Sequence, residues 1–149
     1  MAVGLSFGVE GQPVGGNAGY EIGRGPRTGR HGKLRLGDDG SRIERRTIIK
    51  TAEAKVYTEL VAIRAREAMP SGWAPEELIV VELYFFLGRE IDCDNRMKFI
   101  DDGIQLGTGV NDKWFLPRAM TKVAGLRPPS RRVVVSIVDL ASVASAPAS

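Results

Sequence analysis

The sequence of 149 residues has little of three features that mark particular classes of protein. Its one cysteine, Cys93, excludes an internal disulfide framework, and a free thiol suits a reducing compartment. Its one histidine, His31, has no second ligand at metal-site spacing, so we interpret it as an exposed bystander. No apolar run approaches the roughly 18 residues of a membrane span, and the first residues lack the order of a signal peptide. We therefore expect a cytoplasmic protein without a membrane partner.

The composition indicates one folded domain with a small positive charge. Hydrophobic residues make up 43% of the chain, which is enough for a packed core, and the length fits one domain. Lysine and arginine number 21 against 18 aspartate and glutamate, a formal net charge of +3. Because this excess is small, the positions of the charges say more than their sum. We expect one domain over residues 1–140, followed by a disordered tail over 141–149 that is rich in small residues.

The apolar pattern predicts an α+β fold, in which two helices pack on a mixed β-sheet. In chain order we expect a strand over 3–9, a helix over 41–69, a strand over 77–87, a helix over 95–106, and strands over 113–123 and 132–140. The run over 77–87 is almost continuously apolar, which indicates a strand buried on both faces.

The helix over 41–69 is the longest predicted element. Ser41 and Glu44 fit a capping box at its start, and Pro70 follows its end. Its expected core positions recur at near-helical spacing and are Ile48, Val56, Leu60 and Ile63. The expected core stripe of the shorter helix consists of Met97, Ile100 and Ile104.

A long glycine-rich loop over 10–40 carries much of the positive charge. It is either a flexible, solvated segment or a basic arm that grips phosphates, in which glycine lets the backbone approach and arginine donates paired hydrogen bonds. Cations at the start of the next helix oppose its macrodipole, so they have no evident local stabilising purpose. This favours the phosphate-binding interpretation slightly. The candidate phosphate contacts are Arg24, Arg27, Arg30, Lys33, Arg42, Arg45 and Arg46.

Acidic side chains gather directly after the apolar run over 77–87. Asp92 and Asp94 are one residue apart, so both can point to one side of an extended backbone. Asp94 is also a strong N-cap residue for the helix expected from Asn95. Lys98 lies on the same helix face as Asp94, one turn further along.

Two further acids extend this cluster. Asp102 continues the helix face by another turn, and Asp112 follows a Gly-Val-Asn turn. Two carboxylates at 4 Å repel each other by about 4 kcal/mol at an effective dielectric constant of about 20. A divalent cation with oxygen ligands is the usual way to offset such repulsion.

Other motifs with two spaced aspartates fit less well. An EF-hand loop fails because Met97 and Gly103 stand where it needs Gly and Glu. A phosphoaspartate hydrolase would have the apolar strand run directly into Asp92, with Thr or Val in place of Arg96. A nucleotide-sugar transferase usually has a larger domain. A purely structural helix cap remains open, although it leaves the later acids unexplained.

The pattern Asp-x-Asp-Asn-x-x-Lys-x-x-x-Asp, followed by Gly-Val-Asn-Asp, resembles that of the RusA-like Holliday junction resolvases, small homodimeric endonucleases of bacteria and their phages. The matching positions are Asp92, Asp94, Asn95, Lys98, Asp102, Gly109, Val110 and Asp112. Gly11, Pro13, the basic loop and a helix bearing Tyr57 are similar to the family's first half, so the resemblance spans roughly residues 7–138. The chain departs from the family at Lys113, where a second acid often stands, and in its longer, more glycine-rich loop.

The resemblance implies a homodimer that binds Mg²⁺, or Mn²⁺ in its place, through Asp92, Asp94 and Asp112. Lys98 would then stabilise charge on the scissile phosphate or orient the nucleophile. Asn95 and Asp102 would not bind the metal but would hold these groups in position.

We therefore expect a metal-dependent endonuclease that resolves Holliday junctions or other branched DNA in recombination, repair or phage DNA processing, in a bacterial or phage-infected cell. One alternative is a non-catalytic protein that binds branched DNA and whose acids hold a structural ion. Another is a metal-dependent phosphohydrolase of a small substrate, which leaves the basic arm without a purpose.

Overall fold

The computed structural model describes residues 4–15, 19–26, 38, 44–75 and 77–140, and only the backbone over 22–26 and 44–48. The predicted tail over 141–149 and His31 lie outside this part of the chain.

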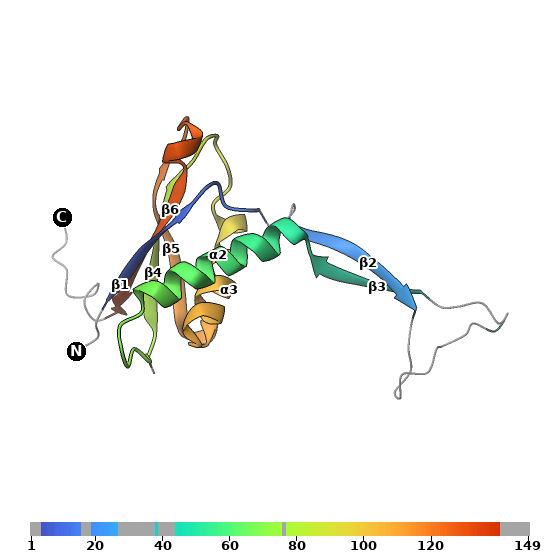
Figure 1. Ribbon diagram of the computed structural model, residues 1–149, viewed down its shortest axis with the longest axis horizontal. Coiled ribbons are helices and arrows are strands. Elements are labelled where there is room, and N and C mark those ends of the chain that lie inside the picture. The colour runs from blue at the N-terminus through green and yellow to red at the C-terminus, as the bar shows by residue number, and fades with distance from the viewer. Residues whose placement is uncertain (1–3, 16–18, 27–37, 39–43, 76, 141–149) are drawn as a thin grey trace.

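A four-stranded mixed sheet forms the body of the protein. Its strands are β1 (Leu5–Glu10), β4 (Ile79–Phe86), β5 (Phe115–Val123) and β6 (Arg132–Asp139), in the spatial order β1-β6-β4-β5. β6 pairs antiparallel with β1 and β4, whereas β5 runs parallel to β4. The helices α2 (Ala52–Ala68) and α3 (Asp94–Thr108) pack against this sheet (Figure 1). The predicted α+β fold, with two helices on a mixed sheet, is therefore confirmed.

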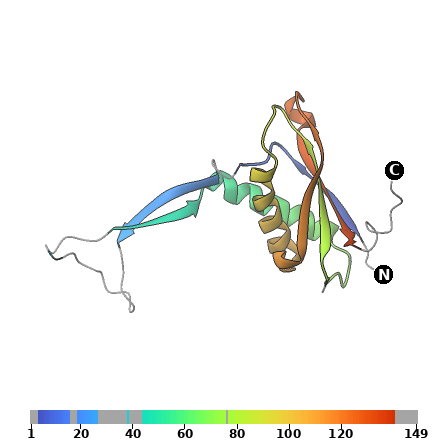
Figure 2. The ribbon, with the colours of Figure 1, turned by 180° about the vertical axis from the view of Figure 1, so that it is seen from behind.

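Both helices cover the same face of the sheet. Leu83, Phe85 and Leu87 point to this face and are fully buried, together with Ile100 and Ile104 of α3. The alternate β4 positions from Glu82 to Phe86 are half-buried, because the other face has no helix over it (Figure 2). The prediction that the strand over 77–87 is buried on both faces is therefore wrong for its second half.

A two-stranded antiparallel ribbon projects from the body (Figure 1). It consists of β2 (Tyr20–Pro26) and β3 (Glu44–Lys50), paired from Tyr20 opposite Lys50 to Pro26 opposite Glu44. This ribbon was not predicted, because β2 lies in the segment predicted as a loop over 10–40 and β3 lies in the helix predicted from Ser41. β3 contains the β-branched sequence Thr-Ile-Ile, which favours a strand.

The long helix begins at Ala52, not near Ser41. Thr51 is its N-cap, and its hydroxyl accepts a hydrogen bond from Ala54 N at 3.3 Å. The predicted capping box is therefore wrong, since Glu44 opens β3 and Ser41 lies outside the described residues.

α2 buries Tyr57 and several small side chains rather than all of the large aliphatic ones expected. Val56 is 65% exposed and Ile63 is 47% exposed, so both predictions of core positions are wrong. The buried face consists of Ala54, Tyr57, Thr58, Val61, Ala62 and Ala65. These residues let α3 approach closely, as the contacts at Gly103 and Gly107 show: a Cβ added at Gly103 would lie 2.5 Å from that of Val61.

The predicted core positions of α3 agree better with the structure. Ile100 and Ile104 are fully buried as predicted, Met97 packs at the margin of the core, and Phe99 joins them. The helix ends at Gly109, which has a φ of 75° that glycine adopts without strain.

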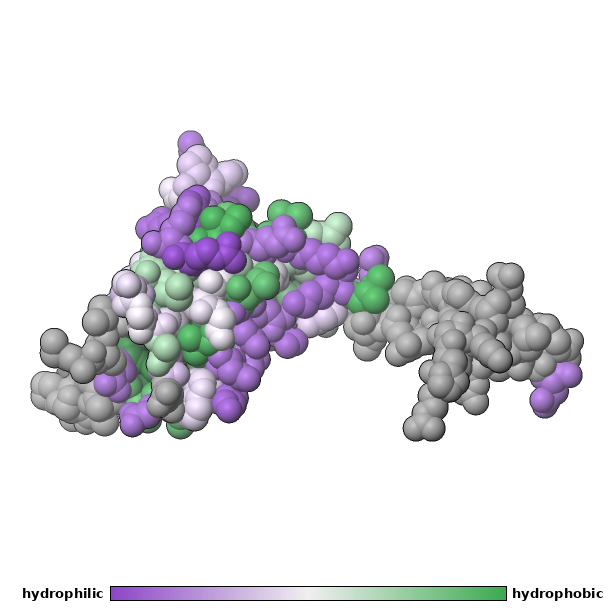
Figure 3. Space-filling view, turned by 60° about the horizontal axis from the view of Figure 1, so that its bottom comes forward, coloured by the Kyte–Doolittle hydropathy of each residue, from purple (hydrophilic) through white to green (hydrophobic). Residues whose placement is uncertain are grey.

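The surface of the described residues is mostly hydrophilic on the face shown in Figure 3, where apolar side chains form separate patches. None of the helices in the described part of the chain is both long enough and apolar enough to cross a membrane.

Candidate functional site

The acidic stretch lies where the chain leaves β4 and enters α3. Asp92 Oδ1 accepts a hydrogen bond from Asp94 N at 3.1 Å, and Asp92 Oδ2 accepts one from Asn95 Nδ2 at 3.1 Å. The N-cap residue is Cys93, and Asp94 is the first residue of the helix. The prediction of Asp94 as the N-cap is therefore wrong, because the side chain of Asp92 closes this turn instead.

Asp92 and Asp94 form a pair of exposed carboxylates at this point. Each oxygen of Asp92 accepts one hydrogen bond and can accept another. Asp94 is the first residue of α3, and its backbone N–H is the donor to Asp92 Oδ1. Mg²⁺ is commonly bound by one or two carboxylates together with waters and substrate phosphates. The donor set of Asp92 and Asp94 therefore fits a Mg²⁺ or Mn²⁺ site that substrate would complete.

Asp112 does not join this pair. It opens the short 3₁₀ helix η1 (Asp112–Trp114), which leads into β5 at Phe115, opposite the first residue of β4, Ile79. Asp92 instead follows the other end of β4, and α3, about 22 Å long, lies between them. Among the described residues no three His, Cys, Asp or Glu side chains are placed to hold a metal ion. The geometry thus offers two of the three acids that the resemblance implies.

Lys98 lies one turn beyond Asp94 and pairs with Asp102, with Nζ 3.4 Å from Oδ1. The Asp102 carboxylate raises the pKa of Lys98, with Tyr20 and Asp112 contributing in the same direction. Lys98 therefore stays cationic, which suits stabilising negative charge rather than accepting a proton.

Asp102 also holds the base of the ribbon. Its Oδ2 lies 2.6 Å from Nζ of Lys50, the last residue of β3, and the Lys50 ammonium lies 5.5 Å from the centre of the Phe99 ring. Tyr20, the Cα partner of Lys50, packs against Phe99 with ring centres 5.2 Å apart. These contacts place the base of the ribbon beside the second and third turns of α3.

The ribbon carries some of the predicted phosphate contacts. Arg24 is the Cα partner of Arg46, and Arg45 is the partner of Gly25. Like charges at directly opposite positions destabilise an antiparallel pair, which a bound polyanion would offset. The other predicted contacts lie outside the described residues and are Arg27, Arg30, Lys33 and Arg42.

Two titratable groups in the site were missed from sequence. Lys122 of β5 pairs with Glu90 and donates to the carbonyl of Ile91 at 3.4 Å. The hydrogen bond to Glu90 is the main cause that raises the pKa of Lys122, and the charge of Asp92 acts in the same direction. Its place beside Asp92 depends on the parallel pairing of β5 with β4, which no local pattern reveals. The other is Asp101, a largely buried neighbour of Asp102.

Cys93 has no evident chemical role here. It is buried, and this burial is the main cause that raises the pKa of its thiol. A thiol that is harder to ionise is a poor nucleophile, so Cys93 serves packing.

Comparison of the sequence with models of known protein families, and with curated proteins, finds no match.

Proposed function

We propose that the protein is a metal-dependent endonuclease that cuts four-way junctions or other branched DNA. One observation carries this proposal. Exposed carboxylates of Asp92 and Asp94 stand at the start of α3, with the cation Lys98 one turn on, beside the base of a ribbon that carries paired arginines. Acids that hold a cation, next to basic residues that contact phosphates, are one arrangement that supports hydrolysis of a phosphodiester.

Asp92 and Asp94 would hold Mg²⁺, or Mn²⁺ in its place, with the remaining positions left to water and phosphate oxygens. When bound, the ion would polarise the scissile phosphate and lower the pKa of a water for attack. Asn95 fixes the orientation of the Asp92 carboxylate through its hydrogen bond to Oδ2. Asp112 is left out of this pair by the geometry described above.

Lys98 would stabilise negative charge on the phosphate as the bond breaks. Its ammonium is exposed, so it can leave the 3.4 Å contact with Asp102 for a phosphate oxygen. Asp102 keeps Lys98 protonated and ties Lys50 at the base of the ribbon, which is a positioning role.

A homodimer completes the proposal. A four-way junction must be cut in two strands symmetrically, and a dimer with two-fold symmetry presents one site to each. We infer the dimer from the resemblance to the RusA-like resolvases. The same resemblance is the basis for proposing that the protein acts in the bacterial cytoplasm.

A DNA-binding protein without catalysis is the second candidate. The observation that favours it is that both Asp92 oxygens already accept hydrogen bonds at the start of α3, so this acid has a structural use without a metal.

Cleavage of a labelled four-way junction with Mg²⁺ or with chelator separates the two functions, with duplex and flap DNA as substrate controls. We expect symmetric nicking by the wild type that needs the metal, and a fall of at least about a hundredfold for Asp94→Asn. Glu59→Gln is the matched control, because it removes one exposed carboxylate from α2. Junction binding that survives chelator, with no cleavage under Mg²⁺ or Mn²⁺, would instead establish the binding protein.

A further inference from the structure

Two segments meet at the end of the sheet where β4 stops and β6 begins. Leu87 N donates to the carbonyl of Val123 at 2.7 Å, and Leu126 N donates to the carbonyl of Leu87 at 2.9 Å. The turn after β4 is thereby fixed beside the turn that joins β5 to β6. Because hydrogen bonds within the chain set their positions, residues 88–90 and 124–132 form one defined surface.

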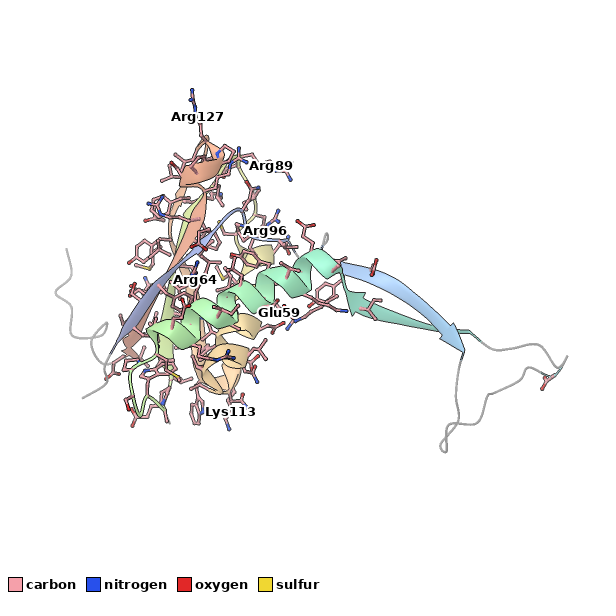
Figure 4. The ribbon with its side chains drawn as sticks, viewed as in Figure 1. Glu59, Arg64, Arg89, Arg96, Lys113 and Arg127 are labelled. Atoms are coloured by element: carbon pink, nitrogen blue, oxygen red, sulfur yellow. The ribbon has the colours of Figure 1, made fainter. Side chains whose placement is uncertain are left out.

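This surface gathers four arginines, which we call the apical arginine cluster: Arg89, Arg127, Arg131 and Arg132. Figure 4 shows Arg127 at the top of the molecule with Arg89 below it. No carboxylate among the described residues forms an ion pair with any of the four. Two acids that are neighbours of the cluster in the sequence or in the sheet are used elsewhere, since Glu90 pairs with Lys122 and Glu10 pairs with Arg64.

Two of the four arginines contribute to the fold. Arg131 Nε donates to the carbonyl of Leu126 at 2.9 Å, and its guanidinium lies over Gly88, where any larger residue would collide with it. Arg132 lies 4.3 Å from the centre of the Phe86 ring and donates to the carbonyl of Ser130. Both leave N–H groups free to face outward.

Arg89 and Arg127 have no such use. Both are exposed, and within the described chain neither side chain makes a hydrogen bond, an ion pair or a ring contact. Four like charges on one surface repel one another, and packing explains only two of them. An anionic partner would give the other two a use, because arginine presents a planar set of donors that matches phosphate oxygens.

The cluster lies at the same end of the sheet as the paired carboxylates. Arg89 and Asp92 belong to the same turn between β4 and α3, and Lys122 stands close enough to Asp92 to be affected by its charge. The ribbon base lies beside α3, whereas Arg89 and Arg127 lie at the end of the sheet (Figure 4). A phosphate chain that reaches Asp92 from the side away from the ribbon must pass these arginines.

We propose that the apical arginine cluster binds the phosphodiester backbone of DNA on the side of Asp92 opposite the ribbon. This inference rests on the proposed function for its ligand, but not on catalysis. Arg89 and Arg127 supply the contacts that the fold does not need, while Arg131 and Arg132 hold the surface in shape and add two further charges.

The test measures equilibrium binding to a fluorescent four-way junction in chelator, over a series of salt concentrations. Each phosphate contact contributes about −0.9 to the slope of log K against log salt on duplex arms. For Arg89→Gln/Arg127→Gln we expect the slope to become less steep by about 1.8, and the affinity at about 0.1 M salt to fall roughly tenfold to a hundredfold. The single Arg127→Gln variant changes only a side chain that makes no contact within the described chain, and it should give about half of the slope change.

The matched control is Arg66→Gln/Lys113→Gln, which removes the same charge from exposed positions in the last turn of α2 and in η1. If the salt slope of this control became less steep by the same amount, the change would be a general effect of charge, and the proposal that the apical arginine cluster contacts DNA would be wrong. An unchanged slope in the apical variant, with wild-type binding intact, would overturn it as well. A wild type that binds no DNA refutes both proposals, whereas one that binds with the expected slopes but never cuts refutes the nuclease alone.

Discussion

Asp101 has the most perturbed carboxyl group near the site. Burial raises its pKa to about 7, and the nearby charges of Asp102 and Asp112 act in the same direction, against Lys98. Its Oδ1 is buried without a hydrogen-bond partner among the described residues. Below about pH 7 the carboxyl group of Asp101 is therefore mostly protonated in the folded state.

The sign of the resulting pH dependence follows from linkage. Between about pH 4 and pH 7 the folded state binds a proton on Asp101 that the unfolded state has released. The contribution of Asp101 to stability is therefore full below about pH 4 and is lost as the pH rises through 7. Three pH units at about 1.4 kcal/mol each set an upper limit of roughly 4 kcal/mol.

Asp101→Asn should remove this dependence, because the amide has the shape of the protonated acid and does not ionise. We expect the variant to be more stable than the wild type at pH 8, by up to roughly 4 kcal/mol, and similar to it at pH 4. Urea unfolding at pH 4, 6 and 8 measures the difference. Glu59→Gln, an exposed change, should follow the wild-type curve; parallel curves for Asp101→Asn and the wild type would contradict the assignment.

At the scale of the elements, the pair of helices depends on glycine in α3. A Cβ added at Gly107 would overlap the backbone carbonyl of Ala62, and backbone cannot rotate away as a side chain can. Gly107→Ala gains about 1 kcal/mol of helix propensity but forces α2 and α3 apart, at a cost of about 1–3 kcal/mol.

Gly107→Ala should therefore lower the free energy of unfolding by up to about 2 kcal/mol, although alanine is the better helix former. Leu106→Ala is the control, since Leu106 is 56% exposed and its loss should cost under about 0.5 kcal/mol. Urea unfolding of the two variants decides the matter. A stabilised Gly107→Ala protein would show that the helices can separate without loss.

The elements that the sequence predicts well are those with strong local signals. The four body strands and α3 have a clear apolar pattern, and each was predicted within a few residues. β3 was absorbed into the predicted helix because Ile48 fits a helical period extended backward from Leu60. Its partner β2 contains two glycines and a proline, so its strand signal is weak. These two segments form strands because they pair with each other, and this pairing between distant segments is not visible in the local sequence.

The same contrast holds for the site. Asp92, Asp94, Asn95 and Lys98 are close in the sequence, so their grouping around one helix start was predictable. Whether Asp112 reaches them depends on which end of the sheet β5 enters, and a parallel crossover puts it at the far end. The roles of Lys122 and Lys50 likewise needed the pairing of strands to be known.

At the scale of the whole molecule, the paired carboxylates lie between two basic surfaces. The ribbon carries Arg24, Arg45 and Arg46 on one side, and the apical arginine cluster lies on the other. If one DNA molecule contacts both surfaces at once, it must pass over the start of α3. If the surfaces act separately, each is an alternative mode of binding and the carboxylates need not be covered.

A double-mutant cycle distinguishes these arrangements. The variants are Arg24→Gln/Arg45→Gln/Arg46→Gln on the ribbon, Arg89→Gln/Arg127→Gln at the apex, and their combination. With simultaneous contacts, each variant alone weakens junction binding strongly, and the losses in log K add because the sites are separate. The salt slopes should become less steep by about 2.7 and about 1.8, and by their sum in the combination.

Alternative modes give a different pattern, because the total binding constant is then the sum of two. Removing one mode leaves the other, so each variant alone lowers the affinity by about twofold when the modes are equal, and only the combination abolishes binding. That result would place DNA at either end of the molecule but not across Asp92 and Asp94. Additive losses, measured in chelator and without any cleavage, would instead mean that a bound strand crosses the carboxylates, where a nuclease needs its scissile phosphate to be.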